Sequence, residues 1–214
     1  MKKTAFTLIE IVFVIVIIGI LSAVLAPSIK RATLQECADQ IASHIRYTQQ
    51  LALNDNKFNP NVQDWYKTRW QIFFQNANVY NDQHISYTIY SNLNKNTNAN
   101  SSEIAKNPLN PKQVLSGGTV GASYGTANVT KSMNIGHKYG ITNVTFSNNC
   151  NNAKRIAFDY LGRPLKSDVR TLTNKYKAGA INRLLQQNCS ITISDGTNSK
   201  TIVITPETGY VYIQ

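Results

Sequence analysis

Residues 1–27 read MKKTAFTLIEIVFVIVIIGILSAVLAP, and this stretch decides the fold. Two lysines precede an almost unbroken apolar run from Phe6 to Ala26, in which Glu10 is the only charged residue. A helix rises about 1.5 Å per residue, so the run extends about 32 Å and matches a bilayer core of about 30 Å. It therefore predicts a membrane-spanning helix, and the lysines on its N-terminal side predict a cytoplasmic N-terminus.

Two simpler interpretations of this run are a secretory signal peptide and a plain membrane anchor. A signal peptide has an apolar region of about 7–15 residues and a small-residue cleavage site. Here the run is longer and continues without a break into a polar helical pattern. A plain anchor leaves Glu10 unexplained, because placing a carboxylate at mid-membrane costs about 2.5–3.5 kcal/mol. The alternative is that Glu10 lies near the membrane interface, where its carboxylate reaches water.

The leader and the block Phe-Thr-Leu-Ile-Glu (Phe6 to Glu10) resemble the N-terminal signal of type IV pilins and type II secretion pseudopilins. The resemblance implies cleavage between Ala5 and Phe6 by a prepilin peptidase, N-methylation of Phe6, and a filament core made of the apolar helix. It also implies that Glu10 sets the register between subunits by pairing with the Phe6 amine of a neighbour. Ala5 departs from the glycine that the family usually has before the cleavage site.

A second helical pattern extends from Ser28 to about Asn56. Its apolar and small residues recur three or four positions apart: Ile29, Thr33, Cys37, Ile41, Ile45, Thr48 and Ala52. No capping pattern separates this segment from the apolar run, so the sequence predicts one continuous helix, bent near Pro27. One face of its second half is expected to pack against a sheet.

Residues 58–214 alternate between short strand patterns and turn-rich stretches. The expected strands cover residues 70–74, 84–91, 113–115, 141–147, 155–159, 190–194, 201–205 and 210–213. Turns at Asp195-Gly196 and at 206–209 separate the last three, which predicts an antiparallel meander. Residues 92–112 are rich in Asn, Ser and Pro and are expected to form a loop.

The predicted fold class is α+β, with a long N-terminal helix packed on a C-terminal antiparallel β-sheet domain, as in pilins. The helix has a transmembrane half and an amphipathic half. The expected parts are a leader peptide (1–5), a transmembrane or filament-core helix (6–27), an amphipathic stalk helix (28–57) and a periplasmic β-rich domain (58–214).

Three stretches of the β-rich domain narrow the resemblance to minor pseudopilins of the GspH type and FimT-like minor pilins. They are residues 70–74, 156–164 and 201–213. The resemblance implies a structural subunit of a type II secretion or type IV pilus-like machine, contributing to filament initiation or to the tip. Its expected partners are other pilins or pseudopilins, the prepilin peptidase and the inner membrane. The expected location is a single-pass inner-membrane protein with a periplasmic C-terminal domain, and a pilus or pseudopilus after assembly.

The chain has three cysteines, Cys37, Cys150 and Cys189. Disulfides persist in the periplasm. Cys150 and Cys189 both lie just before predicted strands of the globular domain, and we expect them to form a disulfide, with Cys37 as the odd thiol. The cysteine spacing matches no metal-ligand pattern, so no metal site is expected.

The chain carries a formal net charge of +11, which favours polyanions without selecting DNA, anionic lipid or lipopolysaccharide. Residues 154–183 concentrate this charge, and Tyr160 and Tyr176 lie between the cations. The basic residues are Lys154, Arg155, Arg163, Lys166, Arg170, Lys175, Lys177 and Arg183. Such a segment can track a phosphate backbone, and FimT-like minor pilins are associated with DNA capture in natural transformation. A DNA-binding minor pilin is therefore the alternative function. The two simpler explanations of the basic segment are a solvated surface and a surface that matches an acidic neighbour in the filament.

No residue pattern predicts catalysis or a cofactor. His44, His84 and His137 lie in different predicted elements, and no metalloprotease, nucleotide-binding or serine-hydrolase motif occurs. The stretch Asp195-Gly196-Thr197-Asn198 fits a hairpin turn better than a calcium loop. The sequence therefore predicts a structural protein and not an enzyme.

Overall fold

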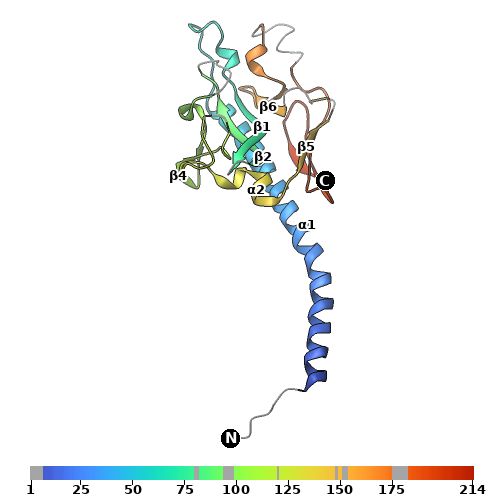
Figure 1. Cartoon of the computed structure of the whole chain (residues 1–214). Coiled ribbons are helices and arrows are strands. Elements are labelled where there is room, and N and C mark those ends of the chain that lie inside the picture. Colours follow the sequence, from blue (N-terminus) through green and yellow to red (C-terminus); the bar gives the residue numbers. More distant parts are fainter. Residues whose placement is uncertain are drawn as a thin grey trace.

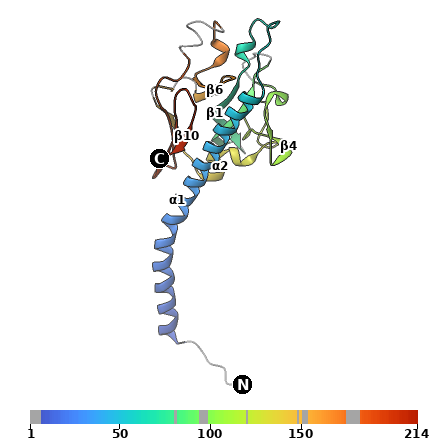
Figure 2. The same ribbon diagram turned by 180° about the vertical axis from the view of Figure 1, so that it is seen from behind.

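One helix, α1 (Leu8–Asn54), forms the axis of the molecule, and its C-terminal half is embedded in a β-rich domain (Figures 1 and 2). The computed structural model describes residues 7–79, 82–93, 99–119, 121–147, 149–150, 154–174 and 183–214, without the side chains of residues 23–32 and 82. The helix continues through Pro27, which confirms the prediction of one continuous helix. Figure 1 shows the helix changing direction where it leaves the domain.

The expected membrane span is covered only in part, because Phe6 and the side chains of residues 23–26 lie outside the described residues. From Leu8 to Ser22 the chain is helical, and these residues are exposed. Within the described part of the chain, no helix contains an apolar stretch long enough to cross a membrane.

The strands of the described residues form two antiparallel four-stranded sheets and one hairpin. The first sheet has the order β2-β1-β6-β7, and the second has the order β10-β9-β8-β5. The first contains β1 (Trp70–Val79), β2 (Asp82–Ser91), β6 (Arg155–Phe158) and β7 (Pro164–Lys166). The second contains β5 (Asn143–Phe146), β8 (Cys189–Ser194), β9 (Ser199–Ile204) and β10 (Val211–Ile213). The hairpin consists of β3 (Lys106–Asn107) and β4 (Asn110–Val114).

Short helices connect these strands. They are α2 (Ile135–Tyr139) and the 3-10 helices η1 (Trp65–Lys67), η2 (Ser101–Glu103), η3 (Lys131–Met133) and η5 (Val169–Thr171). The loop expected at 92–112 is wrong in part, because η2, β3 and the start of β4 lie there. These elements are too short for a periodic pattern, so local caps and tertiary contacts hold them. In α2, for example, the Asn134 side chain accepts the His137 backbone N–H at 3.0 Å.

The α+β class, with an N-terminal helix and antiparallel sheets, agrees with the sequence prediction. The meander of the last three strands is confirmed as β8, β9 and β10. The sequence did not predict that β5 pairs with β8 as the fourth strand of this sheet. That pairing joins residues 45 to 51 positions apart in the chain, and the alternation of apolar residues in β5 is compatible with several partners.

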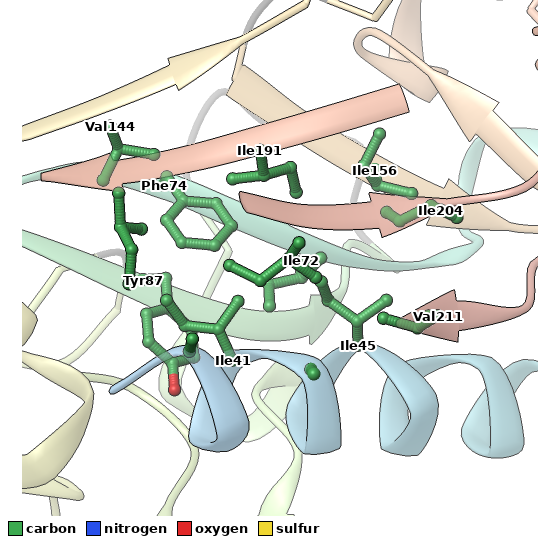
Figure 3. Packing of buried hydrophobic residues seen from close by; sticks show 14 of the residues in the cluster. Ile41, Ile45, Ile72, Phe74, Tyr87, Val144, Ile156, Ile191, Ile204 and Val211 are labelled. Carbon is green, nitrogen blue, oxygen red and sulfur yellow. The ribbon is translucent and has the colours of Figure 1, made fainter. Parts of the chain in front are cut away.

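The buried face of α1 lies in the seam between the two sheets. It contacts β1 and β6 of the first sheet and β9 and β10 of the second. Figure 3 shows Ile41 and Ile45 pointing toward Ile72 of β1, with Val211 of β10 beside Ile45. All of these side chains belong to one apolar cluster that spans both sheets, so α1 closes a single core. The face also includes Leu34, Cys37, Ala38, Ala42 and Ala52.

Polar contacts fix the rotation of α1 within this seam. Gln40 Nε2 donates to the hydroxyl of Tyr87 at 2.7 Å, and that hydroxyl lies 2.7 Å from His44 Nδ1. Burial lowers the pKa of His44 to about 4, so the ring is neutral at pH 7 and Nδ1 can accept a hydrogen bond from the Tyr87 hydroxyl. One turn further on, Gln49 Nε2 donates to the carbonyl oxygens of Gly162 and Thr208, both at 2.7 Å.

Cys150 and Cys189 form a disulfide that ties the start of β8 to the segment after β5. Cys37 is a free thiol on the buried face of α1. Burial raises the pKa of Cys37 to about 12, with the nearby Glu36 carboxylate adding to this effect. Since the thiolate is the reactive form, Cys37 is protected in the folded protein.

We expect alkylation to distinguish the three cysteines. Without reductant and at pH 8, the native protein should take up no iodoacetamide, and the denatured protein should take it up at Cys37 alone. Replacing the bridge in the double variant Cys150→Ser, Cys189→Ser should lower the free energy of unfolding by about 3–4 kcal/mol, the chain-entropy value for a loop of this size. Peptide mass spectrometry and urea unfolding measure both effects, with Cys37→Ala as the control. Alkylation of all three cysteines in denatured, unreduced protein would contradict the bridge.

Candidate functional site

Thr7 and Glu10 form a reciprocal cap at the start of α1. The Glu10 backbone N–H donates to Thr7 Oγ1 at 3.4 Å, and the Thr7 backbone N–H donates to Glu10 Oε2 at 3.1 Å. The Thr7 hydroxyl also lies 3.1 Å from Glu10 Oε2. This Thr-x-x-Glu capping box pairs donors that the first turn of a helix leaves open. This role of Glu10 was not predicted from the sequence, although the Thr-x-x-Glu spacing of the two residues was a signal for it.

The N-terminal half of α1 presents apolar side chains on every face. From Leu8 to Leu21 its large apolar side chains are between 44% and 81% exposed. Figures 1 and 2 show this half projecting away from the β-rich domain. Soluble monomers rarely expose an apolar surface of this extent, so it is a surface to be covered by lipid or by other helices. Ala5 and Phe6, the expected cleavage and methylation residues, lie outside the described residues.

The basic segment 154–183 is partly neutralised within the domain. Arg155 was expected to contact DNA, and the structure corrects this, because Arg155 is buried with 5% of its surface exposed. Its guanidinium lies 3.9 Å from the ring centroid of Phe73, and Nη1 donates to the Tyr90 hydroxyl at 3.1 Å. The same nitrogen lies 3.3 Å from Asp168 Oδ2. Arg155 therefore supports the first sheet from inside and cannot reach a phosphate.

Asp168 binds two arginines of the segment at once. Besides Arg155, it accepts the Arg170 Nε–H, with Oδ1 at 2.9 Å. Burial raises the pKa of Asp168, but the hydrogen bond from Arg170 and the charge of Arg155 outweigh it, so the pKa lies below its usual value. Arg170 is therefore also committed to a contact within the domain.

Arg163 is held by Asp159 in the turn between β6 and β7. Arg163 Nε donates to Asp159 Oδ2 at 2.8 Å, and its backbone N–H donates to Oδ1 at 2.9 Å. Gly162 lies between them with a φ of 78°, a conformation that glycine adopts without strain. The Arg163 side chain remains partly exposed.

The other members of the segment differ in their surroundings. Lys154 is exposed, Lys166 is half-buried, and Arg183 Nη2 donates to Thr171 Oγ1 at 2.8 Å. Among the described residues, no carboxylate pairs with these three cations. Lys175, Tyr176 and Lys177 lie outside the described residues. In the part of the chain that the structure describes, no three His, Cys, Asp or Glu side chains gather closely enough to hold a metal ion.

Comparison with known proteins bears on the N-terminus. The prokaryotic N-terminal methylation motif matches residues 1–26. This is the motif of type IV pilin-like precursors. The match coincides with the exposed apolar half of α1 and includes the Thr7–Glu10 cap, and it supports a membrane-anchored, pilin-type structural subunit. No curated protein and no solved structure matches the chain.

The contact between Asp168 and the two arginines predicts a pH-dependent stability. Asp168→Asn should lower the free energy of unfolding by about 3–5 kcal/mol at pH 7, because it leaves the buried Arg155 without a counter-charge. The pKa of Asp168 is lowered in the folded state, so its contribution is present above the ordinary value of about 4 and is lost as the pH falls through the folded value.

Urea unfolding at pH 7 and at pH 3 measures this effect. The difference in the free energy of unfolding between wild type and Asp168→Asn should be smaller at pH 3 than at pH 7. The control is Asp39→Asn, an exposed carboxylate on α1, which should change stability little at either pH. A variant as stable as wild type at pH 7 would mean that Arg155 does not depend on Asp168.

Proposed function

We propose that this protein is a minor pilin or pseudopilin, assembled by a type II secretion or type IV pilus-like machine and contributing to filament initiation or to the tip. The observation that supports it is the exposed apolar half of α1, which coincides with the methylation motif and continues into the helix that forms the core of the domain. One continuous helix thus joins an assembly segment to a folded domain. The filament would be built by packing, without a chemical step at this chain.

Processing would expose the assembly segment. A prepilin peptidase would cleave between Ala5 and Phe6, and Phe6 would be methylated on its new amine. Before assembly, the apolar run would lie in the inner membrane, with its N-terminus cytoplasmic and the β-rich domain periplasmic. Assembly would exchange lipid for neighbouring helices. Gly19 suits this exchange, because nothing beyond its chain neighbours and the adjacent helix backbone lies within 4 Å of the position of an added Cβ among the described residues, and small residues allow helices to approach closely.

Glu10 would set the register of this packing. Cleavage would place the cationic Phe6 amine directly before Thr7, one residue from the capping box. The cap holds the Glu10 carboxylate at the start of the helix, where a neighbouring amine can pair with it. A buried charge in apolar surroundings is stable only with such a partner, so the pair would favour one axial position over others.

A DNA-binding minor pilin for DNA uptake is the alternative. It receives less support, because Arg155, Arg163 and Arg170 of the basic segment are engaged with carboxylates of the same domain. Lys154, Lys166 and Arg183 are the described cations of the segment that would remain for phosphate contacts. Salt-dependent retention of the full chain on double-stranded DNA, lost in a variant with these three cations replaced by glutamine, would favour this alternative.

Processing is the first test of the proposal. In cells with an active prepilin peptidase, the membrane-extracted protein should lack residues 1–5 and carry one added methyl group on Phe6. Intact-protein and peptide mass spectrometry measure both changes. Ala5→Gly should be processed at least as completely, and Ala5→Leu should remain uncleaved. A wild-type protein that keeps Met1 in such cells would remove the pilin interpretation.

Two substitutions of Glu10 separate its charge from its role as a cap. Glu10→Val removes both, whereas Glu10→Gln keeps an acceptor for the capping box and removes only the charge. If the ion pair sets the register, both variants should lose most co-purification with partner pilins, because an unpaired buried charge costs about 3–5 kcal/mol. Membrane insertion and the thermal midpoint of the β-rich domain should be unchanged in both. Normal assembly of Glu10→Gln would reduce Glu10 to a helix cap.

A further inference from the structure

A short stretch of α1 connects the exposed apolar half to the β-rich domain. The apolar run ends at Ala26, and Leu34 is the first residue of α1 whose side chain is described and buried. Eight positions separate the two, so at about 1.5 Å per residue the domain begins about 12 Å beyond the apolar run. The headgroup layer extends about 5–7 Å from each side of a bilayer core. In a chain anchored by its apolar run, this end of the domain therefore lies within reach of the headgroups.

The hairpin β3–β4 and the stretch η3–α2 together form what we call the proximal surface. Figures 1 and 2 show β4 and α2 in the half of the domain from which α1 emerges. Gln40 Nε2 of α1 donates to the Ser132 carbonyl oxygen of η3 at 3.0 Å. Asn107 Nδ2 of the hairpin donates to Thr130 Oγ1 at 3.2 Å, and the Thr130 backbone N–H donates to the Val114 carbonyl oxygen at 3.2 Å. These bonds join the hairpin to η3, and η3 to the part of α1 just inside the domain.

Three lysines of the proximal surface are exposed and have no anionic partner. They are Lys106 on β3, Lys112 on β4 and Lys131 at the start of η3. Among the described residues, no carboxylate forms a salt bridge with any of them. Lys131 Nζ lies 5.8 Å from the centroid of the Tyr124 ring, a contact that leaves its charge in place.

The carboxylates that α1 contributes at this level do not cancel the excess of positive charge. Glu36 accepts from Lys138 Nζ at 3.1 Å, so this pair is neutral as a unit. Asp39 is exposed and accepts from the side-chain amide of Gln35 at 3.2 Å. One carboxylate without a cationic partner thus stands against three lysines without an anionic one.

The tip of the hairpin presents an apolar side chain between its lysines. Leu109 is 94% exposed. Its backbone N–H donates to Asn107 Oδ1 at 2.9 Å, and Pro108 and Pro111 restrict the backbone on either side. A single exposed leucine is ordinary on a protein surface. A leucine held at a fixed tip beside lysines is instead the combination that binds the interface of an anionic membrane.

We propose that the proximal surface docks on anionic phospholipids of the membrane that holds α1. This inference rests on the membrane anchoring given under Proposed function. The three lysines would lie against lipid phosphates, and Leu109 would enter the boundary between headgroups and acyl chains. A lipid surface is favoured over an acidic protein, because α1 keeps the domain beside the headgroups and makes their effective concentration high. Docking would hold the domain in one orientation until assembly withdraws α1 from the membrane.

A tryptophan at the hairpin tip reports on this contact. The full-length variant Leu109→Trp is reconstituted into vesicles of phosphatidylcholine alone or mixed with phosphatidylglycerol, and the spectrum of wild type is subtracted to remove Trp65 and Trp70. With phosphatidylglycerol, the emission of the new tryptophan should shift to the blue and be quenched by lipids brominated in their acyl chains. With phosphatidylcholine alone, neither change should occur, and added salt should reverse both. Flotation with the vesicles, which measures anchoring, should be equal in the two compositions.

Two sets of substitutions in the Leu109→Trp protein locate the contact. Replacing Lys106, Lys112 and Lys131 by glutamine should weaken docking by about fivefold per lysine, seen as a loss of quenching. The matched control replaces Lys154, Lys166 and Arg183 by glutamine, which removes the same charge, and should keep the quenching. Figure 1 shows β6, which follows Lys154, farther from the exit of α1 than β4 and α2.

The outcomes separate docking from anchoring. A protein that floats with the vesicles but shows no quenching would overturn the docking alone, whereas a protein that does not float would remove the anchoring and the docking with it. Full quenching after loss of the three proximal lysines, or equal quenching without phosphatidylglycerol, would also overturn the proposal. A blue shift that instead grows with the protein-to-lipid ratio would identify a second copy of the chain as the occupant and overturn it as well.

Discussion

The burial of one face of α1 between two sheets is the constraint on which the rest of this structure depends. Each sheet has an apolar face that must be covered, and α1 covers both at once through Ile41, Ile45 and their neighbours. Because the helix is continuous, fixing its C-terminal half also sets where its ends lie. The apolar half projects from one side of the domain, and α1 ends toward the other side (Figure 1). The positions of the exposed apolar half and of the opposite end of α1 are therefore both consequences of how α1 packs between the sheets.

The arginines of the domain show that a basic composition is not the same as a basic surface. The formal charge of +11 includes side chains that stabilise the interior. Arg155 stacks on Phe73 and pairs with Asp168, and Arg163 closes the turn after β6 through Asp159. Arginine suits such positions because it remains charged and can bind several acceptors in one plane. Arg69, which directly precedes β1, is similarly buried, and among the described residues no carboxylate forms an ion pair with it.

The start of α1 illustrates how one side chain can serve a local and an assembled state. In the single chain, Glu10 completes a capping box with Thr7, which satisfies donors at the beginning of the helix. The same geometry keeps a carboxylate beside the place where processing would create a cationic amine. A charge in an apolar run is then less costly in both states, because it has hydrogen-bond donors in one and an ion-pair partner in the other.

Some features of this protein follow from the sequence by itself, because they depend on neighbours along the chain. The continuous helix follows from the spacing of Cys37, Ile41 and Ile45, and the C-terminal meander follows from alternation and turn residues. The methylation motif is likewise a contiguous stretch, which is why it could be recognised in residues 1–26. Other features were decided only by the tertiary structure. The pairing of β5 with β8, the burial of Arg155 and the surroundings of Arg69 each depend on segments far apart in the chain. Sequence spacing describes which face of an element is apolar, but it does not say which distant element meets that face. The sequence shows which residues are arginines and therefore carry a positive charge. Whether that charge lies in water or against an aspartate depends on packing, and only the folded chain determines it.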